Sequence, residues 1–515
     1  MNIARTAAQP LHILTTGLLA ASAAGGIAVL VGQAGAPTVL VLMLGAVGAG
    51  VMLARPDWAT LLTAFLLYVN LPAILTKEHG LPGPVAGGVI LLFGVRLVHR
   101  LVIERRPPRV DWTLGLMVAY LAFMLLSTLA AVDTSLALNR VFEFVAEGLL
   151  LYFLVINAVT DLAMLRRVFW VLLAAAALVS TLCLYQDVTG SYTQEFGGLA
   201  HRNYEASDDS SNVEVVRRRR TWDRAQGPVD EPNRFAQVLI VLVPLAMFLF
   251  RNAATPLQRL AAAGLGGLTL MGAGLTLSRG GILTLALLAL AMARIRWVRT
   301  LQLAAGAAVM VVVFSAVSPF FVSRMLSIVN AGHLLGDDQF SHQQADGAMR
   351  GRLTEMLAAL HVFMDHPVIG VGPSQFARYY FVDYAGNAGI KFREINVPRR
   401  AHSLFFELGA EQGVLGLAGF SVLVGGLMWK LWRGRRRWLG RDLERADLAA
   451  ALTLSLFAYL ATGFFLHLSY QRYFWLLVAL GSAALHVVTS REREPRPSAD
   501  GRGGNRLAAV GETTR

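Results

Sequence analysis

The chain has 515 residues, of which 55% are hydrophobic and 15% are charged, and its mean hydropathy is +0.53. This balance excludes an ordinary water-soluble globular domain and indicates a protein that is surrounded by a lipid bilayer. A formal net charge of +13 could suit a nucleic acid. However, the positive residues are divided among short turns and membrane-proximal loops and no nucleic-acid motif occurs, so we expect no nucleic-acid partner.

Apolar runs of roughly 18 to 23 residues recur along the chain, and helices of that length cross about 30 Å of hydrocarbon. We therefore predict an all-α polytopic membrane domain over residues 1–490, with about 12–14 transmembrane helices. The spans are expected to start near Leu11, Pro37, Trp58, Pro84, Trp112, Val141, Val168, Pro232, Leu257, Gly281, Leu301, Ser403, Leu448 and Arg472. We interpret the first run as a retained helix and not as a cleaved signal, because further spans follow it.

Lys and Arg are concentrated in alternate short connections of the chain. Arg105, Arg166 and Arg251 lie in such basic turns, whereas the connections at 32–37 and 131–139 are nearly free of positive charge. Because short basic loops are retained in the cytoplasm during insertion, we expect both termini of this multi-pass inner-membrane protein to be cytoplasmic. Residues 491–515 are rich in Arg, Gly and Pro and are predicted to form a disordered cytoplasmic tail.

This topology places two long loops, residues 187–231 and 323–401, on the outer face of the membrane, which in a bacterium is the periplasmic face. Both are rich in arginine. The arginines could form a solvated surface beside anionic lipid headgroups, or they could bind phosphate or pyrophosphate, whose oxygens guanidinium groups contact in pairs. We favour the second reading for the loops as a whole, and leave the role of the run Arg217–Arg220 open.

The stretch 224–234 leads from the first loop into a membrane helix. Pro232 suits the first turn of that helix, and Asp230 or Glu231 suits its cap. A helix N-terminus between Arg224 and Arg234 would favour an anion. Alternatively, these two arginines pair with Asp230 and Glu231.

A tight turn, Ser278-Arg279-Gly280, joins two apolar runs on the same outer side. An arginine at the membrane interface is costly unless it finds a partner, so Arg279 is a candidate for binding an anion. The alternative is that its side chain extends to lipid headgroups.

The second loop contains an amphipathic helix, predicted over Arg352 to Met364 from apolar residues at helical spacing. Pro367 should end it, and Gly370 and Gly372 should form a tight turn. We expect this helix to lie on the membrane or to cap a cavity, and His366 to be structural rather than catalytic.

Where the second loop returns to the membrane, Arg399 and Arg400 precede His402. Neighbouring guanidinium groups disfavour an imidazolium, so we expect a neutral His402 that can accept a proton. Glu407 and Glu411 are four residues apart and should share a helix face that His402 does not share. A lone interfacial histidine is often only a polar contact, but the two arginines favour chemistry here.

Other site types receive little support from the sequence. The acidic pairs Asp208/Asp209 and Asp337/Asp338 could hold a divalent cation, but such pairs usually belong to solvated loops, so we predict no metal and no cofactor. The single cysteine, Cys183, cannot form an internal disulfide.

In their order and spacing, four segments resemble the O-antigen ligase and polymerase superfamily of bacterial membrane glycosyltransferases. They are Arg224 to Asn233, Ser278 to Gly280, His366 to Gly372 and His402 to Gly416. With the many helices, the resemblance covers nearly the whole chain, although each motif is short. Ser403 is a departure, because the family commonly has asparagine after the histidine.

The resemblance implies a GT-C-like fold and an enzyme that uses no nucleotide sugar. It would move a glycan from undecaprenyl pyrophosphate to an acceptor hydroxyl at a periplasmic active site, with inversion and without a metal. His402 matches the family's proposed base, and Arg224 and Arg279 match arginines proposed to bind the pyrophosphate. To these we add Arg234 and Arg400 as pyrophosphate-binding candidates. The expected supporting residues are Asn233, Ser278, Glu411, Gly370 and Gly372.

The acceptor stays open at this stage. A ligase would transfer the glycan to lipid A core, in lipopolysaccharide biosynthesis, or to a protein. A polymerase would extend a carrier-linked repeat in O-antigen or exopolysaccharide biosynthesis. We lean towards a ligase.

A lipid-linked-glycan transporter would bury charges along a path through the membrane. The intramembrane acids are few, chiefly Glu143 and Glu147, so an enzyme is favoured. The oligomeric state is also open.

Overall fold

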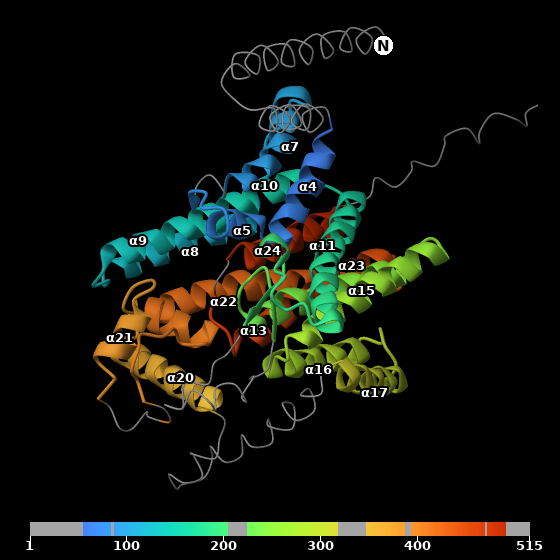
Figure 1. The fold of residues 1–515 in the computed structure, drawn as a ribbon. Coiled ribbons are helices and arrows are strands. Elements are labelled where there is room, and N and C mark those ends of the chain that lie inside the picture. The colour runs from blue at the N-terminus through green and yellow to red at the C-terminus, as the bar shows by residue number, and fades with distance from the viewer. Residues whose placement is uncertain are drawn as a thin grey trace, which may run out of the picture.

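The computed structural model describes residues 55–83, 87–203, 224–317, 347–386, 392, 394–468 and 471–490. Within these residues the chain is almost entirely helical (Figure 1), which confirms the predicted all-α fold. Several predictions fall outside the described residues. They concern the spans near Leu11 and Pro37, the Arg217–Arg220 run, the pairs Asp208/Asp209 and Asp337/Asp338, and the tail 491–515.

The helices of the first part of the chain alternate between α-helical, 3-10 and π-helical segments. They are α4 (Pro56–Tyr68), α5 (Leu71–Lys77), η1 (Gly88–Phe93), α7 (Gly94–Val98), η2 (His99–Ile103), α8 (Trp112–Thr128), α9 (Thr134–Glu143), η3 (Phe144–Leu150), α10 (Leu151–Ala158), α11 (Leu162–Thr189) and η4 (Phe196–Gly198). Two short strands, β1 (His201–Asn203) and β2 (Arg224–Gly227), pair antiparallel, with Arg202 opposite Ala225.

The second part of the chain consists of longer helices. They are α13 (Pro232–Ile240), α14 (Val243–Arg251), α15 (Pro256–Leu275), α16 (Arg279–Arg294), α17 (Thr300–Val317), α20 (Gly347–Asp365), α21 (Phe376–Val382), α22 (Leu404–Trp438), α23 (Leu443–Gly463) and α24 (Gln471–Thr489). The amphipathic helix of the second loop is present as α20, which ends before Pro367 as predicted. Helix α13 begins at Pro232, also as predicted.

The described residues contain six helices that are long and apolar enough to cross a membrane, or seven if the bent pair α4–α5 forms one span. Each expected span from Trp58 onward coincides with a helical segment. The predicted total of about 12–14 also includes shorter apolar helices such as α8, and the first two runs lie outside the described residues.

Polar side chains fix where many of these helices begin. The side-chain oxygen of the residue before the helix accepts a hydrogen bond from a backbone N–H of the first turn, which would otherwise have no helical partner. These capping residues are Asp111, Asp133, Asp161, Thr255, Ser278 and Asp442.

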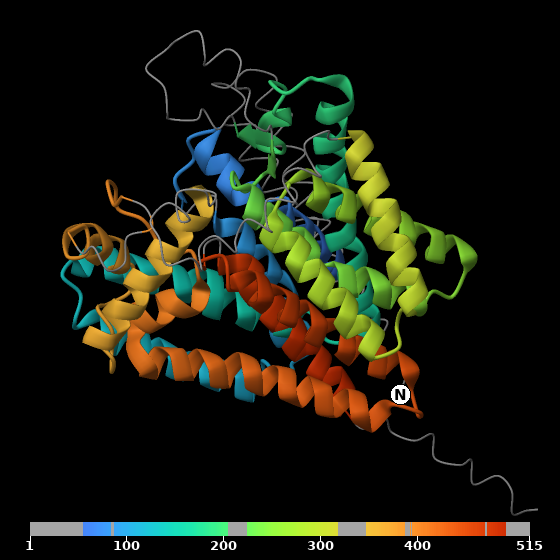
Figure 2. The same cartoon turned by 90° about the horizontal axis from the view of Figure 1, so that it is seen from below.

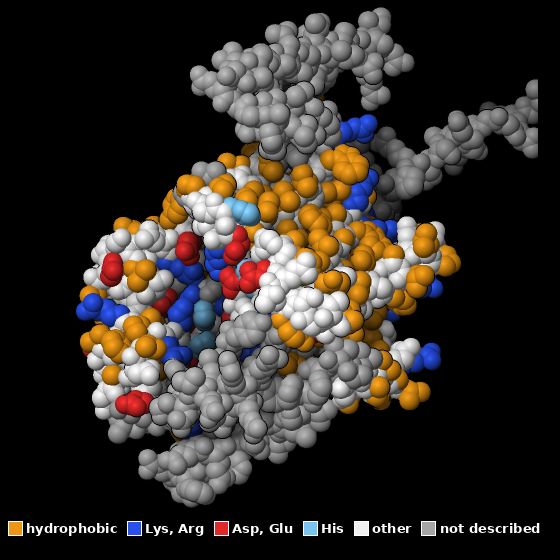
Figure 3. Space-filling model, in the orientation of Figure 1, with side chains coloured by type: hydrophobic (Ala, Val, Ile, Leu, Met, Phe, Trp, Pro, Cys, Tyr) orange, Lys and Arg blue, Asp and Glu red, His pale blue; other side chains and the backbone are white. Residues whose placement is uncertain are grey.

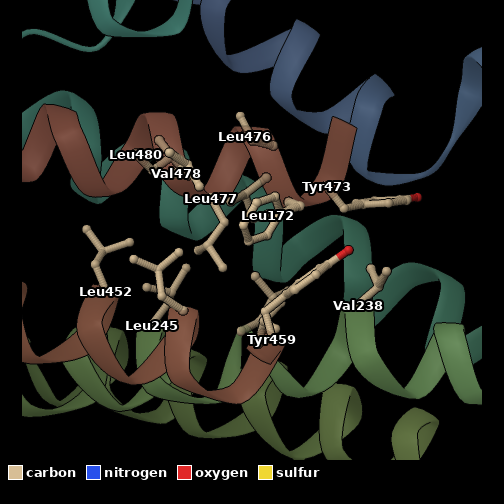
Figure 4. Close-up of a cluster of buried hydrophobic side chains, with 14 of the residues drawn as sticks. Leu172, Val238, Leu245, Leu452, Tyr459, Tyr473, Leu476, Leu477, Val478 and Leu480 are labelled. Atoms are coloured by element: carbon tan, nitrogen blue, oxygen red, sulfur yellow. The ribbon is translucent and has the colours of Figure 1, made fainter. Parts of the chain in front are cut away.

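The core forms around α24, where it packs against α10, α22 and α23. Figure 4 shows Leu477 of α24 and Tyr459 of α23 directed into the same cluster as Leu172 of α11 and Leu245 of α14. Phe474 and Trp475 of α24 are fully buried. In a bilayer, close packing of this kind holds helices together, because lipid tails are as apolar as leucine.

Helix α22 is broken near its start, and the glycine turn of the second loop docks into the break. Gly413 has φ 62° and ψ −163°, which are not helical angles. Backbone groups freed there bond to the turn: Val414 N–H donates to the Pro367 carbonyl at 2.7 Å, and Gly372 N–H donates to the Glu411 carbonyl at 2.9 Å. Two further bonds join Val371 N–H to Ala410 at 3.0 Å and Leu415 N–H to Val368 at 3.3 Å. Figure 2 shows α20 and α21 at one end of the long α22.

Candidate active site

Two of the predicted motifs meet at one amide oxygen. Arg224, in β2, is buried and donates from Nη2 to Asn233 Oδ1 at 2.9 Å and from Nε to the Thr276 carbonyl at 2.8 Å. Ser278 Oγ donates to the same Asn233 oxygen at 2.9 Å. Arg224 and Asn233 therefore hold the start of α13 against the turn before α16, two segments that are far apart in the sequence.

Helix α16 begins at this junction. Ser278 caps it by accepting from Gly281 N–H at 3.2 Å, and Arg279 is its first residue, half-buried. Gly281 lets α16 pack closely on α13, because a Cβ there would lie 3.1 Å from Ala236 Cβ. A small cavity opens beside this helix start, and Arg352 of α20 lines it together with Asn233 and Ser278. A helix N-terminus with arginines around it favours an anion.

Arg234 lies deeper and has several partners. Its Nε is 3.2 Å from Glu231 Oε2, and its Nη1 donates to the His467 carbonyl at 3.2 Å. The alternative that both arginines pair with the nearby acids is thus half right. Arg234 pairs with Glu231, whereas Asp230 contacts Lys77 and lies 3.4 Å from His201.

His467 is a residue that the sequence analysis missed. Its Nε2 is 3.4 Å from Arg234 Nη2, and its ring lies 5.5 Å from the His402 ring, edge to face. Burial, and then the positive charges of Arg400 and Arg234, hold the pKa of His467 well below its usual value. A neutral His467 facing a guanidinium, which can only donate, must accept at Nε2 and carry its proton on Nδ1. The sequence did contain one signal for His467, namely a histidine placed between two apolar runs.

His402 lies just before α22, with a left-handed backbone (φ 47°). Its Nε2 is 3.6 Å from Glu355 Oε2 of α20. The Glu355 side chain is 2% exposed and that of His402 30%. Glu355 was also missed, because an amphipathic pattern does not reveal that one of its polar positions is covered by another helix.

Arg400, predicted to act on His402, has a carboxylate partner of its own. Its guanidinium forms an ion pair with Glu407 through two hydrogen bonds, and donates to the Leu468 carbonyl at 3.2 Å. Burial alone would lower the pKa of Arg400, but Glu407 outweighs burial and raises it. The Glu355 carboxylate lies 3.6 Å from the His402 ring.

The supporting residues divide into two groups. Asn233 and Ser278 join the two arginine motifs, as described above. Gly370 and Gly372 act on the break in α22: a Cβ at Gly370 would lie 2.3 Å from the Glu411 carbonyl carbon. Glu407 and Glu411 share a face as predicted and line one small cavity with Arg140.

The charged side chains of these elements gather on one face. Figure 3 shows Lys, Arg and His side chains, with acidic ones, in a hollow between the α9 and α21 end of the molecule and its centre. Within the described ranges, no three His, Cys, Asp or Glu side chains come together in a way that could hold a metal ion.

Comparison with known proteins identifies one family. The sequence profile of the family described as O-antigen ligase matches residues 264–421. The matched segment includes Ser278, Arg279, α20, the glycine turn and His402, and leaves out Arg224, Arg234 and His467. No curated protein sequence matches the chain significantly. The profile match over this part of the chain, together with the helical membrane architecture, supports a relationship to the O-antigen ligase-like superfamily.

Proposed function

We propose that this protein transfers a glycan from undecaprenyl pyrophosphate to an acceptor hydroxyl at the periplasmic face of the bacterial inner membrane. The match of residues 264–421 to the O-antigen ligase family supports a membrane glycosyltransferase of the O-antigen ligase or polymerase type in general. The observation that carries the finer proposal is the His402–Glu355 pair beside the arginine-rich junction of α13 and α16.

In this proposal His402 is the general base. Glu355 lies on the Nε2 side of the ring, where its carboxylate favours the positively charged imidazolium that forms when His402 takes the proton of the acceptor hydroxyl. The separation of 3.6 Å is an ion-pair contact, and catalytic contacts of this kind tighten when substrate binds. The buried carboxylate then stabilises the imidazolium that forms.

The arginines serve the leaving group. As the acceptor oxygen bonds to the anomeric carbon, the bond from that carbon to the pyrophosphate oxygen breaks and negative charge grows on the pyrophosphate. Arg352 lines the cavity beside the N-terminus of α16, and Arg279 is the first residue of that helix; in this proposal both supply positive charge to the leaving group. Arg224 fixes the geometry of this turn through Thr276 and Asn233. A single displacement inverts the anomeric centre and needs no general acid.

The test of the base is transfer by the purified full chain from a carrier-linked glycan. His402→Ala should reduce turnover by about 100- to 10,000-fold, whereas the exposed His366→Ala should retain it. Glu355→Gln should reduce turnover less and move the acidic limb of the pH–rate profile to lower pH, because the imidazolium loses its anionic partner. Full activity of folded His402→Ala would refute the mechanism.

Ligase and polymerase share this chemistry, so the acceptor needs its own experiment. We favour a ligase, and the glycan that accumulates on undecaprenyl pyrophosphate in a deletion strain decides the matter. Long chains left on the carrier identify a ligase that acts on lipid A core or a protein. Single repeats identify a polymerase, and the loss of all outward-facing carrier-linked glycan identifies a transporter.

A further inference from the structure

A second polar cavity, of about 500 Å³, lies at the other end of α22. Its walls come from the last turns of α22, the end of α24 and the start of α8. From Val414 to Arg433 the helix rises about 29 Å at 1.5 Å per residue, close to the hydrocarbon thickness of a bilayer. The cavity and His402 are therefore at opposite membrane faces, and in Figure 2 α20 and α21 cover only the His402 end.

Three cations on one face of α22 line this cavity. Lys430, Arg433 and Arg437 follow the i, i+3, i+7 spacing that brings side chains to one side of a helix. Among the described residues, none of the three forms an ion pair with a carboxylate. Lys430 Nζ lies 3.5 Å from the centre of the Trp112 ring, and the Arg433 guanidinium lies 4.7 Å from that of Trp429.

The acidic group in the cavity wall is already occupied. Asp111 accepts hydrogen bonds from Tyr152 at 2.8 Å and Ser482 at 2.6 Å, caps α8 through Leu114 N–H, and lies 3.1 Å from His486 Nε2. Burial alone would raise the pKa of Asp111, but these hydrogen bonds lower it to about 2. The carboxylate is ionised and satisfied within the protein, so the three cations face the cavity without a counter-ion from its wall.

The border of the cavity is apolar and faces lipid. Trp112 is 44% exposed and Trp429 is 56% exposed, and Val422, two turns before Trp429 on the same helix, is also exposed. Exposed tryptophan beside basic residues is typical of the level of the headgroups. A free phosphate would use the cations alone, whereas a phospholipid would also cover these apolar side chains.

We propose that this cavity binds the phosphate headgroup of an anionic glycerophospholipid in the leaflet opposite the active site. Lys430, Arg433 and Arg437 hold the phosphate, and the acyl chains lie along Trp429 and Val422. Close packing of α22 on α24 shapes the site, since a Cβ at Gly434 would lie 2.5 Å from Val488 Cγ1. The binding site is thus formed by helices that also build the core.

The test is native mass spectrometry of the purified full chain with phosphatidylglycerol or phosphatidylcholine added. The double variant Arg433→Gln/Arg437→Gln should bind phosphatidylglycerol about 30-fold more weakly than the unmodified chain does. This follows because each cation near a headgroup contributes about 1 kcal/mol and the variant lacks two of them. The control Arg435→Gln/Arg436→Gln removes the same charge from the same turns but from residues that do not line the cavity. It should bind as the unmodified chain does. Equal losses in both double variants would overturn the proposal.

Two further arms complete the test. Phosphatidylglycerol with a photoreactive group should label the segment 429–437 of the unmodified chain, which requires no variant to fold, and labelling confined to other helices would overturn the proposal. Glycerol 3-phosphate should not displace the bound lipid. If it binds as tightly as the lipid does, the site takes a free phosphate and the lipid assignment is wrong.

Discussion

Replacing Gly370 by alanine should release the glycine turn from the break in α22. Gly370 has φ 69°, a conformation that costs an L-residue about 1–2 kcal/mol. The new Cβ would meet three backbone atoms of Glu411 and Gln412 at 2.3 to 2.4 Å. These atoms belong to the main chain, so no side-chain rotation relieves the overlap, and the turn must withdraw by about 1 Å to reach an ordinary contact.

Such a withdrawal breaks the hydrogen bonds from Val371 N–H to Ala410 and from Gly372 N–H to Glu411. At about 1 kcal/mol for each bond, and at least as much for the strained backbone, the folded state loses at least about 3 kcal/mol. The assay is thermal unfolding in detergent, followed by tryptophan fluorescence, together with glycan transfer. A fall in Tm of about 3 °C is expected, because the unfolding entropy of a 515-residue chain is about 1 kcal/mol/K.

The matched control is Gly425→Ala in the same helix, where a Cβ meets no heavy atom within 4 Å. This variant should melt at the temperature of the unmodified chain or slightly above it, because alanine is the better helix former. If Gly370→Ala melts with the control and keeps full transfer activity, then the docking of the turn into α22 is not a rigid feature of the molecule and the reasoning fails.

The remaining predictions concern the arginines, the buried histidine and the metal. Arg279→Lys should lower turnover, because a point charge cannot reproduce two-point contact with pyrophosphate. The control Arg294→Lys, at the far end of α16, should leave turnover unchanged. If Arg279→Lys turns over as fast as the unmodified chain, Arg279 is a lipid contact. His467 has a pKa held far below its ordinary 6.5, so the unfolded chain takes up its proton first and stability should fall as pH drops below about 6.5. His467→Gln should flatten that part of the pH–Tm profile, and an unchanged profile would show that another group titrates. A chelator should leave transfer unaffected, whereas inhibition reversed by a divalent cation would direct attention to Asp208 and Asp337.

The helices were predictable because their signals are local. Runs of apolar residues with polar caps mark α11 and α23, and Pro367 marks the end of α20, whatever the rest of the chain does. The turn at Ser278 was likewise visible as polar residues between two apolar runs. Each of these features depends on residues within one or two turns of helix.

The contacts within the site were less predictable because they join distant segments. Glu355 reads as an outward-facing polar residue of an amphipathic helix until α22 covers it. Arg400 has Glu407 seven residues later as its partner, and nothing in the sequence indicates that the chain reverses direction enough to bring them together. Gly413 likewise looks in the sequence like an ordinary helix glycine. In the structure its φ and ψ are not helical, and residues 367–372, some forty residues upstream, form hydrogen bonds with the backbone around it.

The docking of residues 367–372 into α22 has a mechanical consequence. Four backbone hydrogen bonds fasten this part of the second loop to a membrane helix, and releasing all of them would cost about 4 kcal/mol, a population of roughly one molecule in a thousand. The turn therefore stays docked in nearly all molecules. Because it follows α20 directly, a displacement of α20 must also pull on α22.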